Sequence, residues 1–151
     1  SIRIARSGPI KRTNVKTLPY PGFPTDMQPQ ISTVLCIGRG TSIITEGVWD
    51  NRYKYVDELT KMGARIQVDG RIAIIEGIEA LSGAPVRAMD LRAGAAMVIA
   101  GLMASGVTEI EGISYIERGY ESLIEKLRGV GADIASVYVP DDDGKSVRDA
   151  G

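Results

Sequence analysis

The sequence predicts an α/β fold made of two similar units, in which short strands alternate with helices. The first observation is an internal repeat, because the segments that begin at Asp26 and Asp90 share one order of features. The second is that apolar helical patterns alternate with short β-branched runs along both segments. The units are expected at about 15–75 and 80–138.

The repeat rests on four pairs of matched positions, whose separation stays nearly constant along the chain. The pairs are Asp26 with Asp90, Gly40 with Gly106, Arg52 with Arg118 and Gly63 with Gly131. The second copy therefore carries only small insertions and otherwise follows the same plan.

A proline-rich segment, "YPGFPTDMQPQ" at 20–30, opens the first unit. Each proline fixes φ and restricts the residue before it, so we expect this segment to be stiff and to hold Asp26 in one place. Thr25 and Gln28 have the spacing of a capping box. A helix is therefore predicted from Met27 to Ile37, with its start near Asp26.

A short β-branched strand follows the first helix of each unit, "TSIITEGV" in one copy and "VTEIEGI" in the other. An arginine-bearing loop and an amphipathic helix come next, and each helix is expected to stop at a glycine. The apolar faces of these helices are Val56, Leu59 and Met62 in the first copy and Leu123, Ile124 and Leu127 in the second.

Two further elements are predicted from local patterns. Arg65 to Ile75 should form two antiparallel strands joined by a type I′ turn at Asp69-Gly70. Leu91 to Met103 is apolar nearly all round, which favours a helix inside the domain with the sheets outside. Past Ile134 the chain loses its periodicity, and 140–151 is expected to be an exposed tail.

Composition limits the chemistry that the chain can perform. It has 151 residues, 44% of them hydrophobic, and a net charge of −1 without a basic stripe, so a single globular domain is expected and nothing indicates a nucleic-acid partner. The absence of histidine and the single cysteine, Cys36, exclude His–Cys zinc sites, Ser-His-Asp triads and an intrachain disulfide. We predict no metal site, no membrane association and a reducing, cytoplasmic location.

Four ordered motifs resemble the UDP-N-acetylglucosamine enolpyruvyl transferases. They are "PYPGFPTDMQPQ", "TEGVWDNRYKYVDELTKMGA", "DLRAGAAMVIAGL" and "YIERGYESLIEKLRGVGADI". The resemblance implies an enzyme of two domains, each an inside-out α/β barrel of three β/α units with helices buried centrally and mixed sheets outside. It also implies transfer of enolpyruvyl from phosphoenolpyruvate to the 3-hydroxyl of UDP-N-acetylglucosamine, with release of phosphate, as the first committed step of peptidoglycan synthesis, and without any cofactor.

The resemblance carries residue roles to this chain. It implies that Asp26 contacts the sugar nucleotide and takes the proton of the attacking hydroxyl, and that Arg118 contacts the carboxylate of phosphoenolpyruvate. It further implies substrate binding by Val48, through its main chain, and by Arg52, Asp90 and Arg92. The alternatives are that Asp26 and Asp90 only cap helices and that the arginines are solvated loop residues.

The chain also departs from the family pattern. The loop with a reactive cysteine, and the lysine and asparagine near the amino terminus, have no counterpart, and Cys36 lies in an apolar helix instead. The chain therefore resembles the carboxy-terminal third of the enzyme. Alone it is expected to be inactive, to need the amino-terminal part as a partner, and to self-associate through uncovered helices.

Two other functions fit parts of the sequence. One is a separate sugar-nucleotide-binding or structural module without catalysis. The other is the shikimate-pathway relative with the same fold, which "FPTDMQ" disfavours.

Overall fold

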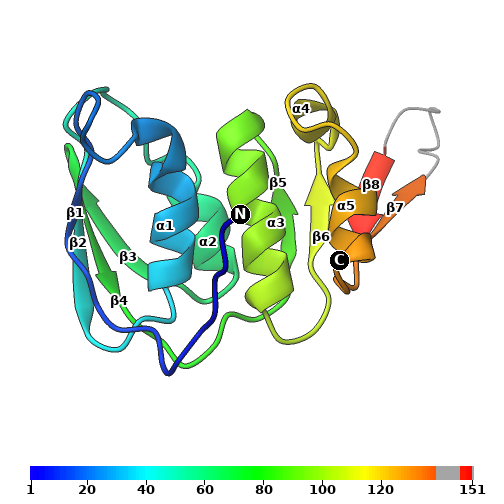
Figure 1. The fold of residues 1–151 in the computed structure, drawn as a ribbon, viewed down its shortest axis with the longest axis horizontal. Helices are drawn as coiled ribbons and strands as arrows, with labels where there is room; N and C mark the ends of the chain where they lie inside the picture. The colour runs from blue at the N-terminus through cyan, green and yellow to red at the C-terminus, as the bar shows by residue number, and fades with distance from the viewer. Residues whose placement is uncertain (139–146, 151) are drawn as a thin grey trace.

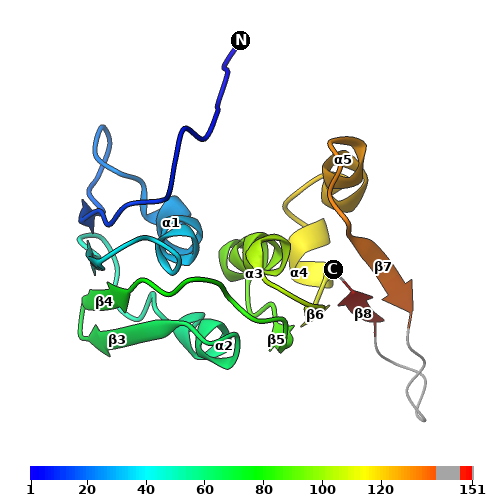
Figure 2. The ribbon, with the colours of Figure 1, turned by 90° about the horizontal axis from the view of Figure 1, so that it is seen from below.

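Two four-stranded mixed sheets form the outer layers of the molecule, with helices between them (Figure 1). The structure, a computed structural model, describes residues 1–138 and 147–150. Residues before the first strand are largely irregular, and Figure 2 shows them running away from the body of the molecule.

The first sheet has the strand order β1-β2-β4-β3. Its strands are β1 (Val15–Lys16), β2 (Thr41–Thr45), β3 (Arg65–Asp69) and β4 (Ile72–Glu76). The β1 and β2 strands are parallel, whereas β4 is antiparallel to both of its neighbours. Inward positions of β2 and β4, such as Ile44 and Ile75, are fully buried because side chains alternate between the two faces of a strand.

The second sheet repeats this order as β5-β6-β8-β7. Its strands are β5 (Pro85–Arg87), β6 (Glu109–Glu111), β7 (Ala135–Tyr138) and β8 (Val147–Ala150). Again the first two strands are parallel and the remaining pairs antiparallel. The two units thus share one strand order, as two copies of a repeat would.

The matched glycines of the repeat share a backbone conformation. Gly40 and Gly106 have φ angles of +99° and +87°, and Gly63 and Gly131 have φ angles of +92° and +99°. Glycine adopts this left-handed region without a steric penalty, which explains why the helices and turns of both units stop at glycine.

Helices fill the space between the sheets. They are the short 3₁₀ helix η1 (Thr25–Met27) and the α-helices α1 (Gln28–Leu35), α2 (Val56–Lys61), α3 (Leu91–Met103), α4 (Ser114–Glu117) and α5 (Leu123–Gly129). In Figures 1 and 2, α1 and α3 lie side by side in the middle of the molecule, and the two helices contact one another. The expectation of buried helices with sheets outside is therefore confirmed.

The helix predicted from Leu91 to Met103 has those bounds in the structure, and its core-facing residues Ala96, Met97 and Ala100 are fully buried. The first helix differs from its prediction, because a 3₁₀ turn precedes α1 and the α-helix ends at Leu35.

Three local predictions are corrected. The capping box is wrong, because neither Thr25 nor Gln28 caps the helix; both side chains instead donate to a buried carboxylate, Glu46. The hairpin pairs Asp69 with Ile72, so its turn residues are Gly70 and Arg71. Only Gly70 has a positive φ, of +58°, which is the φ pattern of a type II′ turn instead of type I′.

The predicted exposed tail at 140–151 falls largely outside the described residues. Within it, Val147–Ala150 forms β8 and pairs with β7 (Ala135–Tyr138), so a strand is present where the sequence predicted an exposed tail. The physical reason is that β8 pairs with β6 and β7 through main-chain hydrogen bonds, which need no periodic apolar pattern.

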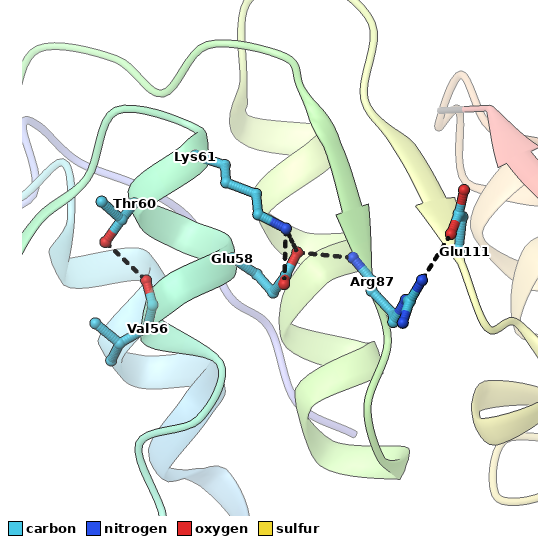
Figure 3. A network of polar contacts seen from close by, with 6 residues as sticks. All are labelled: Val56, Glu58, Thr60, Lys61, Arg87 and Glu111. Atoms are coloured by element: carbon cyan, nitrogen blue, oxygen red, sulfur yellow. Dashed lines mark hydrogen bonds and ion pairs between the residues drawn. The ribbon is translucent and has the colours of Figure 1, made fainter.

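One buried glutamate joins the two units, as Figure 3 shows. Glu58 lies in α2 and is 8% exposed. Its carboxylate accepts hydrogen bonds from Lys61 Nζ at 2.9 Å and from the backbone amide of Arg87, the last residue of β5, also at 2.9 Å. The first unit is therefore hydrogen-bonded to the edge strand of the second.

Candidate functional site

The predicted site residues gather at one end of the molecule. Figure 1 shows α1 and α3 starting at the same end, where α4 also lies. Each helix connects the two parallel strands of its unit, α1 between β1 and β2 and α3 between β5 and β6, and Figure 1 shows the two helices running in the same direction. This end, formed by the starts of α1 and α3, the loop at 46–52 and α4, is called the helix-start end below.

An ion pair joins the two units at this end. Asp26 lies in η1 and Arg92 in the first turn of α3, and the distance from Arg92 Nε to Asp26 Oδ1 is 2.6 Å. The side chains are 58% and 38% exposed, so solvent screens the pair and it contributes about 0–1 kcal/mol to stability. Its importance is geometric, since it brings a carboxylate from one unit beside a guanidinium from the other.

The segment before Asp26 turns back on itself through main-chain hydrogen bonds. The amide of Leu18 donates to the carbonyl of Phe23 at 3.1 Å, and the amide of Gly22 donates to the carbonyl of Pro19 at 2.9 Å. A Cβ atom at Gly22 would lie 2.4 Å from the Cβ of Leu18, so the turn requires glycine there. These contacts agree with the expectation that the segment before Asp26 is constrained.

A buried carboxylate, Glu46, lies directly behind this turn. Glu46 is the residue that follows the last residue of β2, and it is 1% exposed. Oε1 accepts hydrogen bonds from Thr17 Oγ1 at 2.6 Å and from the amides of Val48 at 3.1 Å and Trp49 at 3.4 Å. Oε2 accepts from Thr25 Oγ1 at 3.0 Å and Gln28 Nε2 at 3.3 Å.

The environment of Glu46 keeps it ionised. Burial raises the pKa of a carboxyl group, but the hydrogen bonds from Thr17, Thr25 and the amides of Val48 and Trp49 favour the anion and together outweigh burial. The pKa of Glu46 therefore lies below its ordinary value. A fully hydrogen-bonded carboxylate is the form in which a buried acid is tolerated.

The network extends from Glu46 into the core. Gln28 Oε1 accepts a hydrogen bond from the hydroxyl of Tyr55, which is 2% exposed. Thr17 Oγ1 also accepts from the amide of Gly47 at 2.8 Å. The start of α1, the end of β1 and the loop after β2 are thus held by one continuous set of polar contacts.

The loop at 46–52 carries two further predicted residues. Val48 is half-buried, and its amide is directed to Glu46. Asn51 adopts a left-handed conformation with φ of +54°, a region that asparagine tolerates better than most residues. The Arg52 guanidinium lies 5.6 Å from the centre of the Trp49 ring, in a cation–π contact.

Asp90 and Arg118 belong to the second unit. Asp90 is the N-cap of α3, and its Oδ1 accepts a hydrogen bond from the amide of Ala93 at 2.8 Å, as the capping alternative predicts. Arg118 is exposed at the C-cap of α4. The next residue, Gly119, packs so closely on the start of α3 that a Cβ there would lie 2.2 Å from Leu91 Cδ1.

The structure therefore brings some of the predicted site residues into contact with one another, and the others lie at the helix-start end without a contact between them. Asp26 contacts Arg92, and Val48 shares Glu46 with the segment that carries Asp26. Asp26 is not the N-cap of η1 or α1, whose N-cap residues are Pro24 and Met27, and its carboxylate contacts Arg92 instead. An exposed carboxylate can orient a hydroxyl, and the guanidinium beside it can bind an anion.

Sequence reasoning missed Glu46. One signal could have revealed it: Ser42, Ile44 and Glu46 occupy alternate positions of β2 and its extension, so Glu46 continues the buried face of that strand. A carboxylate on a buried face requires hydrogen-bond partners, so a glutamate at this position predicts a buried polar network around it.

Residues 1–138 and the β8 backbone offer neither a cluster of metal ligands nor a helix that could span a membrane. That part of the chain contains no group of three or more acidic, histidine or cysteine side chains arranged to hold a metal ion. None of its helices combines the length and the apolar character needed to cross a bilayer.

The fold and this site define the class of protein. A family model described as EPSP synthase (3-phosphoshikimate 1-carboxyvinyltransferase) matches residues 1–127. The solved structure of the enolpyruvyl transferase NikO from Streptomyces tendae superposes with a TM-score of 0.77 at 30% identity, covering 85% of this chain and 30% of that one. EPSP synthase from Acinetobacter baumannii has a TM-score of 0.56 at 20% identity, covering 82% of this chain and 28% of that one, which supports the fold alone.

The chain belongs to this family of enolpyruvyl transferases. Among curated relatives, UDP-N-acetylglucosamine 1-carboxyvinyltransferase 3 of Caldanaerobacter subterraneus subsp. tengcongensis is 56% identical over 136 residues, which are 90% of this chain and 33% of the relative. The UDP-N-acetylglucosamine 1-carboxyvinyltransferase of Clostridium botulinum is 56% identical over 134 residues, 89% of this chain and 32% of the relative. The chain thus spans about a third of the length of these relatives.

Proposed function

We propose that this chain is part of an enzyme that transfers enolpyruvyl from phosphoenolpyruvate to the 3-hydroxyl of UDP-N-acetylglucosamine and releases phosphate. The names of relatives that are 56% identical support this substrate. The observation that carries the proposal is the contact between Asp26 and Arg92, because it gathers acidic and basic groups from both units at one exposed end. A cytoplasmic place in peptidoglycan synthesis, with roles in cell shape and division, follows from this reaction.

Each predicted residue has a role in this proposal. Asp26 orients the acceptor hydroxyl and takes its proton, and Arg92 fixes the direction of the Asp26 carboxylate. Arg118 binds the carboxylate of phosphoenolpyruvate through its planar fork of donors. The loop at 46–52 binds the nucleotide through the carbonyl of Val48, since its amide is used by Glu46, and through Arg52.

Asp90 has a different kind of role, because its carboxylate is engaged as the N-cap of α3. It fixes the first turn of that helix and thereby the position of Arg92. The remaining part of the active site, and the second domain implied by the family, would come from residues outside this chain.

The test uses the gene product that contains this sequence, and measures phosphate release with UDP-N-acetylglucosamine and phosphoenolpyruvate. Asp26→Asn is expected to lower kcat by about 10²-fold or more, which is the usual contribution of a positioned general base. Arg118→Lys keeps the charge but loses the fork, and is expected to raise KM for phosphoenolpyruvate. The matched controls are Asp133→Asn and Arg128→Lys, whose side chains are exposed outside the helix-start end.

An unchanged kcat in Asp26→Asn would refute the role of Asp26, and an unchanged KM for phosphoenolpyruvate in Arg118→Lys would refute the role of Arg118. Phosphate release with 3-phosphoshikimate instead of UDP-N-acetylglucosamine would refute the substrate. Tight binding of UDP-N-acetylglucosamine by the complete gene product without any turnover would favour the binding module.

A further inference from the structure

We propose that Glu46 is a positioning residue that holds Asp26 and Val48 in a fixed relation, so that the acceptor hydroxyl meets the Asp26 carboxylate. This inference rests on the proposed function. In this inference the buried side chain of Glu46 aligns Asp26 and Val48, which contact the same substrate in the proposed function.

The two carboxylate oxygens of Glu46 serve different segments. Oε2 accepts only from Thr25 and Gln28, the residues that flank Asp26 in sequence. Oε1 accepts from the amides of Val48 and Trp49 and from Thr17. Because the two oxygens belong to one rigid planar group, any movement of the Asp26 segment relative to the Val48 loop must break a hydrogen bond.

The second unit shows that the fold does not require this carboxylate. Thr17 and Ala88 are equivalent, since each follows the first strand of its unit and donates its amide to the last residue of the parallel strand, Thr45 or Glu111. In the second unit the hydroxyl of Thr17 is replaced by the methyl group of Ala88. The residue after Glu111 is Gly112, which has no side chain at the position of Glu46.

The same strand order is thus built twice, once with the buried network and once without it. Burying a carboxylate is unfavourable unless every oxygen is hydrogen-bonded, and an apolar pair would serve the fold at least as well. The network occurs in the unit that supplies both Asp26 and Val48. We infer that its purpose is the placement of these two residues.

The test compares four variants of the gene product that contains this sequence. Thr25→Val removes a donor to Oε2, and Thr17→Val removes a donor to Oε1 without changing side-chain shape. Glu46→Gln keeps one acceptor oxygen and replaces the other by a donor. Thr33→Val is the matched control, because Thr33 is as buried as Thr17 but its hydroxyl donates to the carbonyl of Pro29, at 2.8 Å, and not to Glu46.

The expected results separate the two sides of the network. Thr25→Val and Glu46→Gln should lower kcat by about 10-fold to 10²-fold, as a displacement of the order of 1 Å in a reacting group does. Thr17→Val, which also leaves the amide of Gly47 without its acceptor, should mainly raise KM and the dissociation constant for UDP-N-acetylglucosamine. Thr33→Val should change the melting temperature and leave both kinetic constants unchanged.

A double-mutant cycle distinguishes positioning from general stability. If Glu46 acts through Asp26, Thr25→Val has no further effect on kcat once Asp26→Asn is present. Equal losses of kcat in both backgrounds would overturn the inference, and so would unchanged kcat in Thr25→Val. If Glu46→Gln does not fold, the Thr25→Val cycle still decides the question.

The same set keeps this inference separate from the proposed function. Unchanged turnover in Asp26→Asn refutes the role of Asp26, and with it the basis of the cycle. A large loss in Asp26→Asn together with no loss in Thr25→Val and Glu46→Gln refutes only the positioning role of Glu46.

Discussion

Replacement of Glu58 should loosen the junction between the two units. Glu58→Ala removes a charged acceptor from the amide of Arg87 at 2.9 Å and from Lys61 at 2.9 Å. A hydrogen bond to a charged group contributes about 1.5–3 kcal/mol, and an exposed helical ion pair adds about 0.3–0.5 kcal/mol. We therefore expect Glu58→Ala to lower the free energy of unfolding by about 2–3 kcal/mol.

Two matched variants divide this loss. Glu58→Gln keeps an oxygen for the amide of Arg87 and loses the ion pair and a charge in the first turn of α2, so it should cost about 1 kcal/mol. Lys61→Met should cost about 0.5 kcal/mol or less, because Lys61 is 53% exposed and solvent screens its charge.

Urea unfolding followed by far-ultraviolet circular dichroism gives the three free energies, and hydrogen exchange at the amide of Arg87 gives the local effect. Faster exchange at Arg87 in Glu58→Ala, but not in Lys61→Met, is the expected pattern. Equal destabilisation by Lys61→Met and Glu58→Ala would refute the reasoning, because the loss would then come from the ion pair within α2 and not from the hydrogen bond between the units.

Two further predictions concern titratable groups. Burial raises the pKa of Glu46, but its hydrogen bonds outweigh burial, so the pKa is lower in the folded chain than in the unfolded chain. The unfolded chain therefore binds the proton more readily. The contribution of Glu46 to stability should be fully present above the ordinary pKa of 4.5 and should fall as the pH drops below that value. Acid titration of the unfolding free energy should show a shallower acid limb in Glu46→Gln, and an unchanged limb would contradict this. Burial raises the pKa of the Cys36 thiol to about 12, so a disulfide reagent at pH 8 should react with it only in denaturant, and rapid labelling of the native protein would disprove the burial.

Local patterns in the sequence were sufficient for the regular elements. The apolar run after Asp90 predicted α3 with its observed bounds, because the capping side chain and the helical pattern lie within the same few residues. Spacing of glycines predicted the repeat, because the same backbone turn recurs in both copies. The strand β8 was missed because its partners β6 and β7 supply the pairing.

The site required tertiary information. Thr25 and Gln28 have the spacing of a local capping box, but the carboxylate of Glu46 competes for the same donors and is a charged acceptor, which forms stronger hydrogen bonds than a neutral one. The contact between Asp26 and Arg92 depends on the packing of α1 against α3, and no pattern within either segment encodes that packing. Sequence reasoning therefore named both residues separately and could not pair them.

The common direction of α1 and α3 has a consequence for how such a site can change. Each unit presents its loops at the same end, while the paired strands that build its sheet form a separate layer. Substitutions in the two loops are thereby separated from the demands of folding, and each copy can specialise independently. In this chain one copy offers a carboxylate and the other a guanidinium, so the duplicated scaffold yields a pair of opposite charges that a single copy could not provide.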